Sequence, residues 1–208
     1  LSPRFLAVVD FLAAARSRAR ILGMANAPGL SVRGVALVSV LGQARRKSNT
    51  LGPLLAAEAS EDLRDVLGRA DPKGWYPAVL HLELLDLLYR YLYDSDDDAF
   101  EEMITASVHD DLRGLHKVLL KVRSPAWALQ QAPRSFRAYF SYGEMELCEP
   151  TPVSGRLQIS MEPSSHALWL GISGGARAFL EASGANAIEL EREVDLAKNQ
   201  CSLHLRWT

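Results

Sequence analysis

The spacing of hydrophobic residues changes once along this chain, close to Pro133. Before Pro133, apolar residues recur every three or four positions, which is the period of amphipathic helices. After it they alternate with polar residues, as Phe136, Ala138 and Phe140 do, which is the period of a strand with one buried face. A helical first half followed by an antiparallel sheet is typical of an α+β fold, so we predict that class.

The predicted helices are separated by breaks rich in glycine and proline. One break, Gly23–Gly29, divides a helix over residues 3–22 from the rest of the chain. We therefore expect residues 1–29 to form an N-terminal helix and hinge, and residues 30–208 to form a single α+β domain. Within that domain, Tyr76–Tyr93 carries leucines around most of its circumference, so this helix should lie near the centre of the fold. Further helices are predicted over residues 32–47, 60–68 and 99–122.

The pattern after Pro133 predicts two hairpins on either side of one helix. Thr151–Gly155 has the residues of a hairpin turn, and Ser164 or Ser165 begins a helix that continues to about Ala182. Alternation returns over residues 187–194 and 201–207. The predicted order is β-β-α-β-β, giving an antiparallel sheet of about four strands on which the helical half packs.

Composition restricts the class of protein. The formal net charge of −2 shows no excess of basic residues, so nucleic acid is not expected as a partner. No apolar run reaches the roughly 20 residues that a membrane-spanning helix needs. Cys148 and Cys201 are too few for the disulfide framework of a secreted protein, which favours the cytoplasm.

Positive charge is concentrated in the N-terminal quarter, whereas the middle of the chain is acidic. Such a group is either a solvated helix face or a contact for an acidic partner or an anionic surface. The residues concerned are Arg16, Arg18, Arg20, Arg45, Arg46 and Lys47.

The segment Gly171-Ile172-Ser173-Gly174-Gly175 matches the G-x-S-x-G pattern of serine hydrolases, in which glycines allow a tight turn around the nucleophile. Asp195 and His204 follow in the order of a hydrolase triad. That fold alternates strands and helices, however, whereas the first half of this chain is nearly all helical. The pattern therefore favours a helix whose small residues pack against a sheet, with a small serine hydrolase using Ser173 as the alternative.

His81 falls on the apolar face of the predicted central helix, in line with Leu85 and Leu88. A neutral imidazole there could ligate haem or a metal. A core histidine with a backbone hydrogen-bond partner is the favoured interpretation. We assign no catalytic residue, no metal ligand and no cofactor.

Several segments together resemble a known group of proteins. They are Trp75-Tyr76-Pro77, Pro133–Phe136, Gly171–Gly184, Ile188–Glu191 and Cys201–Trp207. They are similar to the fold shared by 4-vinyl-reductase-type domains, haem-nitric-oxide-binding domains and TRAPP trafficking subunits. Over residues 30–207 the chain most resembles a myxobacterial paralogous family of unknown function with that layout. The resemblance implies a helical layer on an antiparallel sheet, frequent dimerisation, and an apolar pocket or partner groove.

Two departures from these relatives limit what the resemblance carries. Haem-nitric-oxide-binding domains hold the haem propionates with a Tyr-x-Ser-x-Arg motif, and Tyr139–Gly143 lacks the arginine. In the 4-vinyl-reductase pattern a cysteine stands eight positions before another, and here Glu193 occupies the first position before Cys201. The resemblance therefore supports neither haem nor a cysteine-metal cluster.

From these observations we predict a non-enzymatic sensory or adaptor domain that forms a homodimer and binds a partner protein or a small apolar ligand. The ligand space should lie between the helix at residues 76–93 and the sheet. The residues predicted to line it are Trp75, His81, Leu85, Leu88, Phe136 and Phe179.

Overall fold

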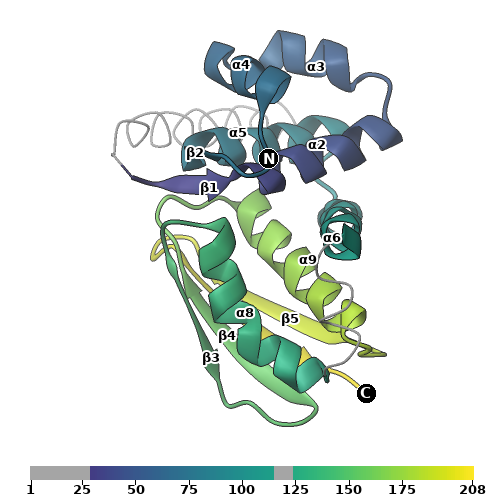
Figure 1. Ribbon diagram of the computed structural model, residues 1–208, viewed down its shortest axis with the longest axis vertical. Helices are drawn as coiled ribbons and strands as arrows, with labels where there is room; N and C mark the ends of the chain where they lie inside the picture. The colour runs from purple at the N-terminus through teal and green to yellow at the C-terminus, as the bar shows by residue number, and fades with distance from the viewer. Residues whose placement is uncertain (1–28, 115–123) are drawn as a thin grey trace, which may run out of the picture.

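The computed structural model describes residues 29–114 and 124–208, and within them helices and sheets separate as in an α+β fold (Figure 1). The first half is mainly helical, with one short ribbon of two strands. α3 and α4 lie outermost, α2 and α5 lie beneath them, and α6 runs beside α9. The elements are β1 (Ser31–Arg33), α2 (Gly34–Lys47), α3 (Leu51–Glu58), α4 (Glu61–Arg69), β2 (Trp75–Pro77), α5 (Ala78–Leu87), a π-helical turn (Leu88–Leu92) and α6 (Asp97–Gly114).

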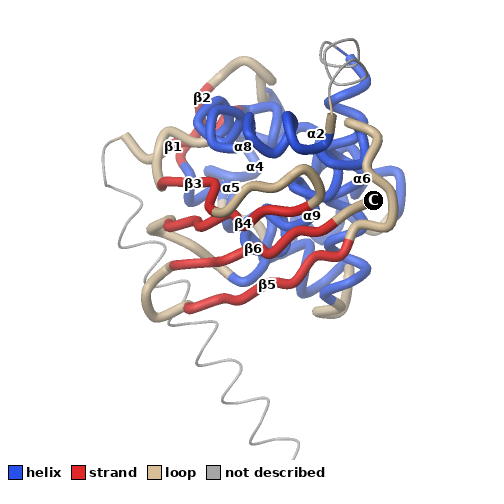
Figure 2. The backbone as a smooth tube through the Cα atoms, turned by 90° about the horizontal axis from the view of Figure 1, so that it is seen from below, coloured by secondary structure: helices blue, strands red, loops and turns tan. Residues whose placement is uncertain are grey.

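The second half contains the main sheet, whose strand order is β3-β4-β6-β5 with every neighbouring pair antiparallel. Its strands form one outer layer, and the helices lie behind it (Figure 2). The predicted order β-β-α-β-β and the four strands are confirmed. The elements are α8 (Pro125–Tyr139), β3 (Glu144–Cys148), β4 (Ser154–Ser160), α9 (His166–Ala182), β5 (Glu189–Asp195) and β6 (Gln200–Arg206).

Alternation along the strands decides which face of this sheet is buried. Leu157 on β4 pairs with Leu203 on β6, and Ile159 pairs with Cys201, and all four are almost completely buried. Because successive side chains point to opposite faces, His204 on β6 lies on the outer face. The inner face of the sheet therefore supplies one wall of the hydrophobic core.

The prediction of a strand around Phe136, Ala138 and Phe140 is wrong, because these residues belong to the end of α8 and the residue after it. The Ser124 side chain caps α8 by accepting a hydrogen bond from the Trp127 amide, and Pro133 lies inside the helix. Phe136 and Phe140 are four residues apart, so they share a face in a helix as they would in a strand. Their ring centroids lie 5.0 Å apart, whereas Ala138 is exposed. The sequence pattern alone did not separate the two periods here.

Helix starts on the N-terminal side are also later than predicted. Residues 31–33 pair with residues 75–77 as the ribbon β1–β2, so α2 begins at Gly34 and α5 at Ala78. Glycine is required at position 34 because the backbone of Asp71 approaches closely there, and a Cβ atom on Gly34 would overlap the Asp71 carbonyl oxygen. The predicted helix beginning after Ser60 is confirmed, with the Ser60 hydroxyl accepting from the Leu63 amide.

α5 lies at the centre of the core, as predicted from its leucines. Leu82, Leu84 and Leu87 are completely buried, and Leu85 is 1 % exposed. A helix that is apolar around its circumference is stable only when other elements surround it. In this structure those elements include α2, α4 and α9.

α9 approaches α6 closely at Gly174. A Cβ atom at this position would lie 2.8 Å from the carbonyl oxygen of Glu101 and 3.2 Å from the Cβ atom of Ile104. The Thr105 hydroxyl donates to the Gly174 carbonyl oxygen at 3.2 Å. At the next residue, Gly175, an added Cβ atom would meet nothing within 4 Å. Two neighbouring glycines thus have opposite surroundings.

We expect the substitutions Gly174→Ala and Gly175→Ala to change stability in opposite directions. Gly174→Ala forces α6 and α9 apart and should lower the free energy of unfolding by about 1–3 kcal/mol. Gly175→Ala should raise it by about 0.5–1 kcal/mol, because alanine loses less conformational entropy in a helix than glycine. Equilibrium denaturation in urea measures both, and equal effects of the two substitutions would contradict the α6–α9 contact.

Candidate functional site

A cavity of about 160 Å³ lies between the helices and the inner face of the sheet. α2, α5, α6, α8 and α9 each contribute side chains to its wall, and Met145 and Leu157 close it from the sheet. An engineered apolar cavity of about 150 Å³ stays dry and binds benzene or xenon, so this space suits a ligand of that size.

Two helices supply the cavity wall at helical spacing. On α6 the lining residues are Ile104, Ser107, Val108 and Asp111. On α8 they are Ala132, Ser135, Phe136 and Tyr139. Both sets follow the i, i+3, i+4, i+7 pattern of one helix face. Each helix therefore presents apolar side chains together with a small number of polar groups.

The space itself depends on glycines in α9. Gly171, Gly175 and Ala176 line the cavity where larger side chains would fill it. A Cβ atom on Gly171 would meet only Leu85, at 3.8 Å. α9 thus lines the cavity with two glycines alongside the larger side chains of Leu168, Ile172 and Phe179.

His81 on α5 is the buried polar side chain of this wall with an unpaired nitrogen. It is 5 % exposed, and its Nδ1 atom has no hydrogen-bond partner among the described residues. Burial lowers the pKa of His81 from an ordinary value of 6.5 to about 4, so the imidazole is neutral at pH 7. The predicted backbone partner is therefore not found for Nδ1. A neutral imidazole inside an apolar cavity can donate or accept one hydrogen bond with a ligand.

Asp111 on α6 brings a carboxyl group to the same cavity. The Ser39 hydroxyl donates a hydrogen bond to its Oδ1 atom. Burial raises the pKa of Asp111, the Ser39 hydrogen bond lowers it, and the neighbouring charge of Asp110 raises it again. Burial and the charge of Asp111 together raise the pKa of Tyr139 to about 12, so this phenol stays protonated at pH 7.

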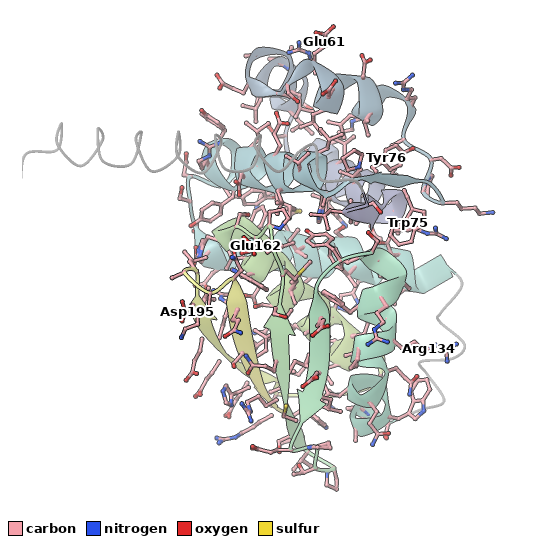
Figure 3. All side chains as sticks on the ribbon, turned by 90° about the vertical axis from the view of Figure 1, so that its left-hand side faces the viewer. Glu61, Trp75, Tyr76, Arg134, Glu162 and Asp195 are labelled. Atoms are coloured by element: carbon pink, nitrogen blue, oxygen red, sulfur yellow. The ribbon has the colours of Figure 1, made fainter. Side chains whose placement is uncertain are left out.

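The structure brings together four of the six residues predicted to line a pocket. His81, Leu85, Phe136 and Phe179 all line the cavity. Leu88 is buried in the core but does not line the cavity, and Trp75 lies at the surface on β2 (Figure 3). Trp75 is 44 % exposed, and the Arg33 guanidinium carbon lies 4.8 Å from its ring centroid. Trp75 is therefore a surface residue of the β1–β2 ribbon.

Sequence reasoning missed the polar groups of the cavity. A strand over residues 136–140 would place Tyr139 on the face opposite Phe136 and Phe140, whereas α8 brings it to the cavity. Asp111 lies in a helix segment rich in charged residues, next to the exposed Asp110. The spacing of Ile104, Ser107 and Asp111 was the signal that could have identified this face.

The predicted basic group is only partly described. Arg16, Arg18 and Arg20 lie outside the described residues, as does the whole predicted N-terminal helix. At the end of α2, Arg46 pairs with Asp110 at 2.5 Å, and the Lys47 ammonium lies 4.5 Å from the Tyr93 ring centroid.

The residues of the alternative hydrolase do not form a triad. Ser173 is completely buried in the middle of α9, where its hydroxyl donates to the Trp169 carbonyl oxygen at 3.0 Å. His204 lies on the outer face of the sheet, with Glu193 at 4.0 Å. Asp195 lies at the hairpin end of β5 and pairs with Lys198 (Figure 3). The sheet thus separates Ser173 from His204.

Within residues 29–114 and 124–208, no group of three or more His, Cys, Asp or Glu side chains is arranged to hold a metal ion. No helix in the same ranges is both long enough and apolar enough to cross a membrane.

The chain belongs to the family described as protein of unknown function (DUF2378), whose model matches residues 47–208. No curated protein matches it. Among solved structures it is similar to the unliganded Fe(II) H-NOX protein from K. algicida, with a TM-score of 0.62, 15 % identity, and coverage of 85 % of this chain and 96 % of that chain. It is also similar to an H-NOX protein from S. oneidensis in the Fe(II)NO ligation state, with a TM-score of 0.62, 10 % identity, and coverage of 85 % and 99 %. The resemblance predicted from the sequence is confirmed, both for a family of unknown function and for the H-NOX fold.

The fold raises the question of haem, and the cavity does not fit it. Sites for drug-sized ligands have volumes of roughly 300–1,000 Å³, and a porphyrin is at least as large as such ligands. The cavity of this protein has a volume of only about 160 Å³. The described lining contains no lysine or arginine to pair with propionates, and it contains the carboxyl group of Asp111. The cavity therefore suits a much smaller molecule without acidic groups.

The burial of His81 predicts a loss of stability in mild acid. The unfolded chain takes up a proton near pH 6.5 and the folded chain only near pH 4, so the unfolded state binds more protons between these values. The stabilising contribution is complete above pH 6.5 and is lost as the pH falls towards 4, by about 3 kcal/mol in total. We expect His81→Leu to flatten this part of the profile, as measured by urea denaturation between pH 4 and 7.

The matched control for this prediction is His204→Leu, which removes a histidine from the outer face of the sheet. It should leave in place the loss of stability between pH 6.5 and 4 that is attributed to His81. An unchanged slope in His81→Leu would show that His81 is not buried in its neutral form.

Proposed function

We propose that this domain is a non-enzymatic sensor that binds a small, largely apolar ligand in the cavity between α5, α6, α8 and α9. The observation that carries the proposal is the cavity itself, an apolar space of about 160 Å³ whose wall includes the buried, neutral His81 with an unpaired Nδ1 atom. Ligand sites in proteins are commonly of this kind, with mostly apolar walls and a few polar groups that fix orientation.

A ligand that fills the cavity contacts the apolar side chains around it. It stabilises the folded state by an amount that grows with the logarithm of its concentration relative to its Kd. The glycines of α9 are what leave the space open, and alanine at Gly175 would meet no neighbouring atom. Retaining glycine there, at a cost in helix stability, is consistent with a space that is kept for a ligand.

The surroundings of His81 favour binding over catalysis. A catalytic histidine is held by hydrogen bonds to a nucleophile on one side and to an orienting group on the other. His81 Nδ1 has no such partner among the described residues, and burial is the cause of its lowered pKa, with no charged neighbour contributing. We therefore propose that the imidazole contacts the ligand without moving a proton.

A sensor also needs a surface through which it reports the ligand. We propose that the domain forms a homodimer or contacts a partner protein for this purpose in the cytoplasm. α6 is placed to carry the signal, because its Asp111 lines the cavity and its Asp110 pairs with Arg46 at the end of α2. Native mass spectrometry of the gently purified protein would report both the number of chains and the mass of any carried ligand.

Binding of toluene tests the proposal directly. At a toluene concentration ten times its Kd, we expect the free energy of unfolding to rise by about 1.4 kcal/mol, seen as an increase in Tm of about 3 °C or more. Gly175→Leu places a side chain in the cavity and should remove this increase.

The matched control is Gly42→Leu, on α2, where an added Cβ atom also meets nothing within 4 Å but does not line the cavity. It should respond to toluene as the wild-type protein does. If toluene, benzyl alcohol and benzylamine all leave the Tm of the wild-type protein unchanged at their solubility limits, the proposed ligand site is refuted.

A further inference from the structure

The described wall of the cavity carries an acidic side chain and no basic side chain. Among its described residues the only acidic side chain is Asp111, and none is lysine or arginine. Asp111 accepts a hydrogen bond from Ser39, and no ion pair within the described residues neutralises it. The adjacent Asp110 differs in this respect, because it pairs with Arg46 at the surface.

As far as residues 29–114 and 124–208 show, the Asp111 carboxyl group has lost part of its hydration without gaining a cation. Burial is the largest cause of the raised pKa of Asp111, because loss of hydration disfavours the charged form of a carboxyl group. A cation bound beside it would reverse that effect, since an opposite charge within about 4–6 Å favours the ionised form.

Aromatic rings lie on the same wall. Tyr139 and Phe136 come from α8, Phe140 follows that helix, and Phe179 comes from α9. Phe136 and Phe140 are in contact with each other, with ring centroids 5.0 Å apart. The faces of aromatic rings attract cations, and they also contact the apolar body of a ligand.

Resting on the proposed function, we infer that the ligand is a small organic amine, whose apolar body occupies the cavity and whose ammonium group donates a hydrogen bond to the Asp111 carboxylate. A hydrogen bond between two charged groups is stronger than one between neutral groups. Carboxylic acids of the same size fit less well, because their charge would face Asp111 and no basic side chain of the described wall would offset it. Neutral molecules fill the cavity without using the carboxylate.

Three probes of nearly equal shape separate these classes, namely toluene, benzyl alcohol and benzylamine. We expect benzylamine to bind the wild-type protein at least about tenfold more tightly than benzyl alcohol, because hydrogen bonds to charged groups contribute more than neutral ones. Isothermal titration calorimetry or ligand-induced NMR shifts at pH 7 would give the Kd of each probe.

Two variants on neighbouring positions locate the effect. Asp111→Asn removes the charge and keeps an oxygen that accepts a hydrogen bond from Ser39. In this variant the affinity for benzylamine should fall to the affinity for benzyl alcohol. Asp110→Asn removes an equal charge from the surface side of α6 and should keep the preference for benzylamine. Since the comparison of probes in the wild-type protein needs no variant, poor folding of Asp111→Asn leaves the inference testable.

The possible results distinguish the ligand class from the cavity site itself. Tight binding of benzylamine that depends on Asp111 and not on Asp110 supports the inference. Binding of toluene with no preference for benzylamine, or a preference that survives Asp111→Asn, overturns the ligand class and leaves the proposed cavity site standing. Failure of all three probes to bind overturns both.

Discussion

The contact between α6 and α9 is the constraint on which the rest of the structure depends. At Gly174 the two helix backbones approach so closely that even a methyl group would collide with Glu101 and Ile104. Around this point the Thr105 hydroxyl bonds to the Gly174 carbonyl, and Glu101 pairs with Arg192 at 2.8 Å. This places α9 between α6 and the sheet, and it turns Gly171 and Gly175 towards the interior, where no side chain replaces them. The same helix therefore fixes the packing on one face and leaves the cavity on another.

The cavity of this protein differs in size and charge from a haem site, although the chain has the H-NOX fold. The chain shares the H-NOX fold at 10–15 % identity, and identity at that level establishes the fold alone. The wall described for this protein is too small and has the wrong charge for a haem with its two propionates. It offers a neutral imidazole, a half-buried carboxyl group and aromatic rings around a space of about 160 Å³. Site chemistry therefore separates this domain from its structural neighbours more clearly than its backbone does.

Much of the fold followed from the sequence, because long segments there have a clear period. The leucines of α5 predicted a central helix, the Ser60 and Ser165 caps predicted two helix starts, and alternation predicted β4, β5 and β6. The prediction failed at α8, where residues four apart satisfy both the helical and the strand period and Pro133 suggested a boundary. Because of that error, Ser135 and Tyr139 are not predicted to line the cavity, since a wrong period assigns side chains to the wrong face. Trp75 was misplaced because the β1–β2 ribbon is held by pairing between residues more than forty positions apart, which local patterns do not record.

The measurement that tests the central claim most directly is a crystal structure of the protein under xenon pressure. Xenon binds dry apolar cavities of this size and scatters strongly enough to be located without assumptions about its position. We expect a xenon peak within the wall formed by His81, Phe136 and Gly175. A crystal structure in which side chains close this space, or in which ordered water fills it and xenon is absent, would show that the space is not an apolar ligand site.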